Sequence, residues 1–178
     1  MIILDFSKAF DRVPHRRLLK KIHHYGIRGN THKWIESFLF NGSQQVVAEG
    51  KTSETVLAIS GVLQGSVLGP LLFLMFINDL PENLTSDTRL FADDAIVYRQ
   101  KTKILENDLA KLAEWEQLWR MEFYPQKCSY LKISRSRKPT TYKYIPKRVT
   151  LAEGTSTKYL GVDIQSNLAW NNHNDRVA

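Results

Sequence analysis

The sequence lacks the features that mark several common protein classes. A single cysteine, Cys128, among 178 residues excludes an internal disulfide framework and a cysteine-based zinc module. The most apolar run, 67–77, is too short to cross a bilayer and contains Gly69 and Pro70. The N-terminus has no basic segment followed by a long apolar stretch, so it is not a signal peptide. We therefore expect an intracellular protein, cytoplasmic, nuclear or both, that is not secreted and has no transmembrane segment.

Acidic residues are absent from one long stretch, 123–152. The same stretch holds four tyrosines and eight basic residues, namely Lys127, Lys132, Arg135, Arg137, Lys138, Lys143, Lys147 and Arg148. Basic residues interleaved with aromatic ones suit phosphate neutralisation and base stacking. A solvated loop between two strands is an equally good interpretation. The formal net charge of +7 agrees with an acidic partner such as nucleic acid, but it also agrees with a need for solubility.

Length and hydrophobic patterning predict a folded chain of mixed α and β structure. The hydrophobic share of 43% excludes wholesale disorder, and 178 residues fit one domain, or one domain and part of another. Apolar spacing predicts helices over about 14–25, 31–40, 71–77 and 105–119. It predicts strands over about 2–5, 44–49, 55–60, 89–92, 95–98, 129–134 and 159–164.

Three aspartates occupy positions that suggest a metal site. Asp93 and Asp94 form the tip of a predicted hairpin, and Asp5 ends the first apolar strand. Adjacent carboxylates repel each other, and hard oxygen ligands favour Mg²⁺. If the strand ends lie side by side, they could hold two ions about 3.5–4 Å apart, as in nucleotidyl transfer. The sequence does not show that the strands are neighbours, and an ordinary Asp-Asp turn with Asp5 as a helix cap is the alternative.

Several segments, taken in order, resemble one known family. They read LDFSKAFD at 4–11, GVLQGSVLGPLLF at 61–73 and FADD at 91–94, followed by KC at 127–128 and YLGV at 159–162. Together they resemble the palm of reverse transcriptases from non-LTR (LINE-like) retrotransposons. The resemblance implies an α/β (α+β) fold, a right-hand polymerase palm with an antiparallel sheet and helices packed on one face. It also implies RNA-templated DNA synthesis, a nucleotidyltransferase activity.

The resemblance implies a catalytic set of four residues. Asp5 and Asp93 match the metal-binding carboxylates of the family, and Asp94 matches the second residue of its Asp-Asp pair, so all three are expected at the metal site. The implied cofactor is Mg²⁺, two ions, with Mn²⁺ as the alternative. Lys127 resembles the lysine proposed to protonate the leaving pyrophosphate; the other interpretation is that it simply belongs to the basic stretch.

The resemblance also implies substrate-binding residues. Phe10 matches the bulky residue that excludes a ribose 2′-OH, although it could equally be a core residue. Gln64 and Gly65 match residues that line the nucleotide and template pocket. Tyr159, Leu160 and Gly161 match the hairpin that grips the primer end.

The expected organisation follows from the same motifs. Residues 1–125 would form the palm core, and 126–178 would form the basic segment and the primer-grip-like region, with fingers and thumb missing. The expected partners are an RNA template, a DNA primer, deoxynucleoside triphosphates and the missing fingers, thumb and endonuclease regions; no membrane partner is expected. The isolated chain is expected to be inactive. The alternatives are a catalytically silent nucleic-acid-binding remnant and an RNA-dependent RNA polymerase, against which Phe10 argues.

Overall fold

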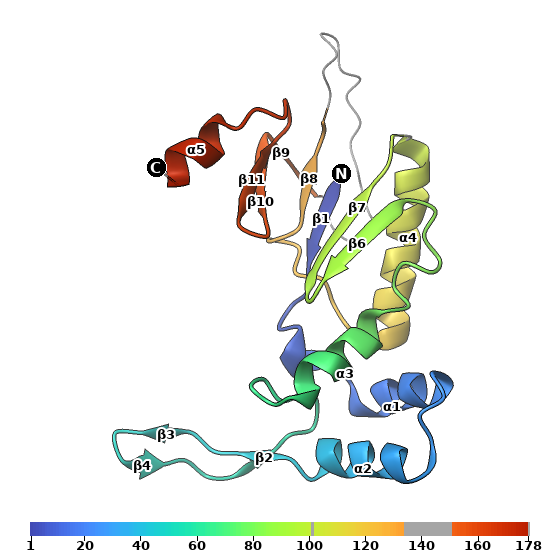
Figure 1. Ribbon diagram of the computed structural model, residues 1–178, viewed down its shortest axis with the longest axis vertical. Helices are drawn as coiled ribbons and strands as arrows, with labels where there is room; N and C mark the ends of the chain where they lie inside the picture. The colour runs from blue at the N-terminus through green and yellow to red at the C-terminus, as the bar shows by residue number, and fades with distance from the viewer. Residues whose placement is uncertain (101, 134–150, 178) are drawn as a thin grey trace. The chain divides into compact units, whose positions relative to one another are not determined.

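The computed structural model describes residues 1–100, 102–133 and 151–177 (Figure 1). Its contacts divide the chain into two compact units. The first comprises 1–7, 79–118 and the residues from 122 onward, and the second comprises 8–78 and 119–121. Among the helices in the described part of the chain, none is long and apolar enough to cross a membrane.

The first unit is built on a five-stranded sheet with the order β6-β7-β1-β8-β9 (Figure 1). Its strands are β1 (Ile2–Asp5), β6 (Asp87–Phe91), β7 (Asp94–Tyr98), β8 (Ser129–Leu131) and β9 (Ala152–Gly154). The pairs β6–β7, β7–β1 and β1–β8 are antiparallel, as expected. The expectation of an entirely antiparallel sheet is wrong at one edge, because β9 pairs parallel to β8.

Apolar residues line both faces of the central strand pair. Ile2 lies opposite Val97 and Ile3 lies opposite Ile96, and all four side chains are buried. Successive strand residues point to opposite faces, so both faces of this strand pair are covered, as the continuous apolar run of β1 predicts. Helix α4 (Thr102–Trp119) belongs to the same unit up to residue 118, and its apolar side is buried through Leu105, Leu109, Leu112 and Trp115.

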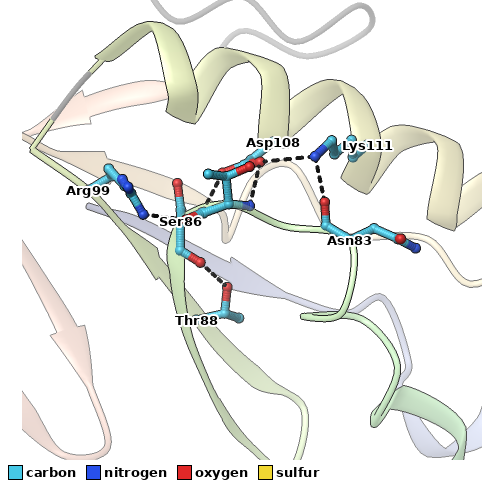
Figure 2. Close-up of polar contacts among 7 residues, drawn as sticks. Asn83, Ser86, Thr88, Arg99, Asp108 and Lys111 are labelled. Atoms are coloured by element: carbon cyan, nitrogen blue, oxygen red, sulfur yellow. Dashed lines mark hydrogen bonds and ion pairs between the residues drawn. The ribbon is translucent and has the colours of Figure 1, made fainter.

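A buried aspartate of α4 anchors the chain where it enters β6. The Asp108 carboxylate accepts hydrogen bonds from the backbone N–H of Thr85 at 3.0 Å and of Ser86 at 2.7 Å. Lys111 pairs with the same carboxylate at 3.8 Å and donates to the Asn83 carbonyl at 2.6 Å. Figure 2 shows these contacts around one carboxylate, with Arg99 on the other side of the segment. The entry end of the β6–β7 hairpin is therefore held to α4 by charge-assisted hydrogen bonds.

The C-terminal part of the first unit differs from the sequence expectation. The predicted strand over 159–164 is wrong: β10 (Ser156–Tyr159) and β11 (Val162–Gln165) form a hairpin instead. Leu160 and Gly161 make its two-residue turn with φ of +47° and +81°, the left-handed conformation that such turns need. Helix α5 (Asn171–Val177) follows. Most of the basic stretch lies outside the described residues.

The second unit contains three helices and a set of short strands. The helices are α1 (His15–His24), α2 (Gly29–Phe40) and α3 (Leu68–Ile77), preceded by the 3-10 helix η1 (Phe10–Arg12). Helix α3 begins three residues before the predicted start and includes Gly69. A Cβ there would lie 2.2 Å from the Leu63 carbonyl, so only glycine fits.

The predicted strands of the second unit are wrong in length: all the residues that pair are exposed, so no buried face specifies a longer register. They are four two-residue pieces, namely β2 (Ser43–Gln44), β3 (Val47–Ala48), β4 (Lys51–Thr52) and β5 (Val56–Leu57). The pairs are β2 with β5 and β3 with β4.

Candidate active site

The candidate site lies where β1 ends and β7 begins, in the first unit. The β1–β7 register places Asp5 directly opposite Asp94, one step beyond the Leu4–Ala95 pair. Directly opposed residues of an antiparallel pair have Cβ atoms about 4.5–5.5 Å apart. The structure thus brings together two carboxylates that are 89 positions apart in the chain. The sequence suggested this proximity but could not establish it.

The third aspartate lies in the turn that precedes β7. Phe91 pairs with Asp94, so Ala92 and Asp93 form a two-residue hairpin turn. Ala92 has φ of +50°, a left-handed conformation that costs a non-glycine residue about 1–2 kcal/mol. Backbone strain of this kind often occurs at functional sites. The predicted tip is therefore correct for Asp93, whereas Asp94 is the first residue of the strand.

The pKa of Asp94 reflects its burial and its two carboxylate neighbours. The pKa of Asp94 is raised, first by burial and then by the negative charges of Asp93 and Asp5. The nearby charge of Lys127 acts in the opposite direction and lowers it. Like charges within a few ångströms disfavour ionisation unless a cation compensates. Burial is thus the largest cause of the upward shift, and the two neighbouring carboxylates add to it more than Lys127 offsets.

Lys127 reaches the same cluster from the loop before β8. Its Nζ lies 3.5 Å from the Asp5 Oδ2, and its side chain is 61% exposed, so the pair is a solvent-accessible ion pair. The loop is fixed to the end of β1, since the Tyr124 N–H donates to the Asp5 carbonyl at 2.7 Å. Cys128, the next residue, is buried, and burial is the largest cause of the raised pKa of its thiol. This agrees with Cys128 as a small core residue.

Tyr159 of the β10–β11 hairpin also lies near the carboxylates. Its pKa is raised by burial and then by the negative charge of Asp94. The hairpin is linked to the sheet, because the hydroxyls of Ser129 in β8 and Thr157 in β10 are 3.0 Å apart. Leu160 and Gly161 form the turn next to Tyr159 and are exposed. The first unit therefore groups Tyr159 with the three aspartates and Lys127.

The remaining predicted substrate residues belong to the second unit. Phe10 is half-buried in η1, and its ring stacks on Phe73 of α3 with centroids 4.5 Å apart. Both interpretations of Phe10 agree with this position, since one face packs on the core. Gln64 and Gly65 are exposed in the loop before α3, and Gly65 has φ of +85°.

The chemistry of the donor set fits a hard divalent cation, although the protein alone does not form a closed cage. Within the described residues, no three His, Cys, Asp or Glu side chains are grouped closely enough to hold an ion by themselves. Mg²⁺ is usually bound by one or two carboxylates together with waters and substrate phosphates. Asp5, Asp93 and Asp94 offer only oxygen ligands and three carboxylates beside one nearby lysine, Lys127, which suits such an open site.

Sequence reasoning missed the contacts that hold the end of β1. Phe6 forms an isolated bridge with Phe123, their rings stack with centroids 4.6 Å apart, and the Ser7 N–H donates to the Glu122 carbonyl. Phe6 also lies 5.9 Å from the ring of Trp115 in α4. Nothing in the spacing of these residues predicts the contact, because it joins segments that are more than a hundred positions apart.

Comparison with known proteins places the chain in a family. The sequence model of the family "Reverse transcriptase (RNA-dependent DNA polymerase)" matches residues 1–164. The chain belongs to this family, and the resemblance that its motifs suggested is confirmed.

Similar proteins include several polymerases of mobile elements. The probable RNA-directed DNA polymerase from transposon BS of Drosophila melanogaster is 30% identical over 97% of this chain. The Pol polyprotein from the type-1 retrotransposable element R2 of Popillia japonica is 25% identical over 93% of it. The chain spans 20% and 31% of the lengths of these two relatives. An apo telomerase structure from Candida tropicalis matches 95% of this chain and 31% of its own with a TM-score of 0.66 at 13% identity, which shows a shared fold.

Proposed function

We propose that this chain is the palm region of a longer RNA-directed DNA polymerase and carries its nucleotidyl-transfer site. The observation that supports this most is the β1–β7 register, which sets Asp5 opposite Asp94 beside the Asp93 turn. Membership of the reverse transcriptase family is the sequence evidence that supports the proposal. The chain matches only 20–31% of the lengths of the two relatives, as a palm within a larger enzyme would.

Asp5 and Asp93 would hold the two Mg²⁺ ions, with Asp94 completing the negative charge of the site. When bound, the ions would supply Lewis-acid stabilisation of charge on the transferring phosphoryl group. The protein's own part is to hold these carboxylates in place through the sheet register and the Tyr124 hydrogen bond to Asp5. The pKa of Asp94 is raised first by burial and then by the charges of Asp93 and Asp5, and a bound cation would offset both effects.

Lys127 would deliver a proton to the leaving pyrophosphate, and its exposed ammonium group is placed 3.5 Å from Asp5. Tyr159, Leu160 and Gly161 would contact the primer end, since Tyr159 lies within electrostatic range of Asp94. Phe10 would exclude a ribose 2′-OH, and Gln64 and Gly65 would line the nucleotide and template pocket. The substrates would be an RNA template, a DNA primer and deoxynucleoside triphosphates.

Single-nucleotide primer extension on an RNA template with Mg²⁺ tests the proposal in the longer polymerase. Asp93→Ala should lower the rate at least about a hundredfold, because preorganised charge supplies most of the rate in such sites. Asp87→Ala is the matched control, since Asp87 is an exposed aspartate at the opposite end of the same hairpin. Full activity of Asp93→Ala would show that the metal assignment is wrong.

The isolated 178-residue chain is expected to show no processive synthesis, because fingers and thumb would be needed to hold template and primer. Processive synthesis by the purified chain would contradict this part of the proposal. Salt-dependent RNA binding that survives replacement of all three aspartates, without any extension, would favour a silent nucleic-acid-binding remnant instead.

A further inference from the structure

A buried histidine of the second unit makes a contact that the proposed chemistry does not explain. His15, the first residue of α1, is 3% exposed, and its Nε2 lies 2.7 Å from the Gly61 carbonyl oxygen. A carbonyl oxygen only accepts hydrogen bonds, so Nε2 carries the hydrogen and donates it. Gly61 opens the loop that leads to Gln64 and Gly65. The contact therefore links α1 to the start of that loop.

Three more hydrogen bonds join residues 60–62 to residues 10–13, the segment just before α1. The Gly61 N–H donates to the Val13 carbonyl at 2.8 Å, and the Val62 N–H donates to the Phe10 carbonyl at 2.7 Å. The Ser60 hydroxyl donates to the Asp11 carbonyl at 2.9 Å. Residues 60–62 thus lie directly against 10–13, and the backbone that carries Phe10 is tied to the loop that carries Gln64.

The approach of the two segments leaves no room for a side chain at position 61. A Cβ on Gly61 would lie 2.8 Å from the Asp11 carbonyl oxygen and 2.9 Å from that of Phe10, and Gly61 has φ of +92°. Both the space and the backbone conformation require glycine here. A contact that holds the Gly61 carbonyl group therefore also fixes how closely residues 60–62 approach residues 10–13.

Packing alone does not account for a histidine at position 15. Its Nδ1 is buried and has no hydrogen-bond partner among the described residues, which is unfavourable for a polar atom. Its ring packs edge-on against Phe40 with centroids 5.4 Å apart, a contact that a phenylalanine would also make. What only the imidazole provides is the hydrogen bond to Gly61.

We propose that His15 is a positioning residue that holds Gly61 and thereby sets Phe10 relative to the Gln64–Gly65 loop. Because Phe10 would exclude a ribose 2′-OH, fixing its position would sharpen discrimination between deoxyribonucleotides and ribonucleotides. This rests on the proposed function, because the role of Phe10 at the sugar belongs to it. His15 touches no substrate and acts only through the backbone of residues 10–13 and 60–62.

Amide hydrogen exchange in the 178-residue chain tests the positioning directly. His15→Phe keeps the ring but loses the donor, and should speed exchange of the Gly61 and Val62 amides about fivefold, the loss expected for one hydrogen bond. His15→Gln carries an amide donor at a similar reach and should restore most of the protection. The control is His32→Phe, because the Nε2 of His32 also contacts a carbonyl oxygen, that of Leu19 at 3.2 Å, away from Gly61. Unchanged exchange in His15→Phe would overturn the proposal.

Nucleotide selectivity in the longer polymerase separates positioning from a merely structural role. The ratio of kcat/KM for dNTP to that for the matching rNTP should fall about fivefold in His15→Phe, recover in His15→Gln and stay unchanged in His32→Phe. Equal loss of both activities, with the ratio intact, would also overturn the proposal. If the unmodified polymerase extends no primer, the proposed function fails, while the exchange data still decide whether His15 holds Gly61.

Discussion

The two ends of the β6–β7 hairpin treat their aspartates in opposite ways. At the entry end, Asp108 is fully buried, and its carboxylate accepts two backbone N–H groups and pairs with Lys111 (Figure 2). At the turn end, Asp93 and Asp94 lie near Asp5. Among the described residues, the exposed Lys127 is the cation that lies beside these carboxylates. In the first arrangement, hydrogen bonds and a lysine stabilise one buried negative charge. In the second, three carboxylates lie together beside one lysine.

This difference indicates what each end is for. A buried carboxylate that is fully hydrogen-bonded stabilises the fold, and its loss leaves donors without partners. Carboxylates that repel one another cost stability and persist where an external cation or substrate compensates them. The turn end of the hairpin is therefore the part of the first unit that we expect to respond to divalent ions and to pH.

The largest expected effect on stability is at the entry end. Asp108→Ala should lower the free energy of unfolding by about 2–3 kcal/mol, because the buried Ser86 N–H and the part-buried Thr85 N–H lose their acceptor. Chemical denaturation measures the change. Glu106→Ala on the exposed side of the same helix should change it by less than about 0.5 kcal/mol. A small effect of Asp108→Ala would remove the contrast between the two ends.

Relieving the backbone strain at Ala92 should stabilise the protein. Ala92→Gly should raise the free energy of unfolding by about 1 kcal/mol or less, because glycine adopts the φ of +50° without a Cβ clash but loses more entropy on folding. Thermal unfolding of the two proteins measures it. Ala95→Gly, in the buried strand next to the turn, should instead destabilise the protein. Destabilisation by both would show that the turn is not strained.

A smaller effect with a definite pH dependence is expected from Asp94→Asn. The raised pKa of Asp94 means that the folded chain favours the neutral carboxyl, so stability is lost as pH rises through that pKa. The amide removes this cost, and the variant should be about 0.5 kcal/mol more stable at neutral pH and no different at pH well below the ordinary carboxyl range. Denaturation measured across pH values checks the sign. A variant that is less stable at neutral pH would contradict the repulsion.

The smallest effect is expected from Lys127→Gln. The Lys127–Asp5 pair is exposed, so its loss should cost at most about 0.5 kcal/mol at neutral pH, and the cost should vanish in high salt. Lys103→Gln on α4 serves as a control for removing one exposed lysine. A large loss of stability in Lys127→Gln would assign this lysine to the fold rather than to the site.

The sequence predicted the strands and helices best where apolar periodicity is strong. The elements β1 and α1 match their predicted spans closely, because apolar periodicity is a local signal, and α4 ends as predicted but begins three residues earlier. The pairing of Asp5 with Asp94 was open, since nothing local states which strands are neighbours. Asp108 could not be recognised, because a charged residue on an amphipathic helix ordinarily faces water. The predicted strand over 159–164 runs across the β10–β11 turn, because that turn contains Leu160, a residue that rarely adopts positive φ.

The most direct test of the central claim is cation binding at the turn end. Mn²⁺ titrated into the 178-residue chain reports binding through loss of the free-ion electron paramagnetic resonance signal, with Mg²⁺ added as competitor. The unmodified chain and Asp87→Asn should bind equally, and Asp93→Asn should bind about tenfold more weakly, because it loses one carboxylate ligand of the site. Equal Mn²⁺ binding by all three proteins would contradict the assignment of the carboxylates to a metal site.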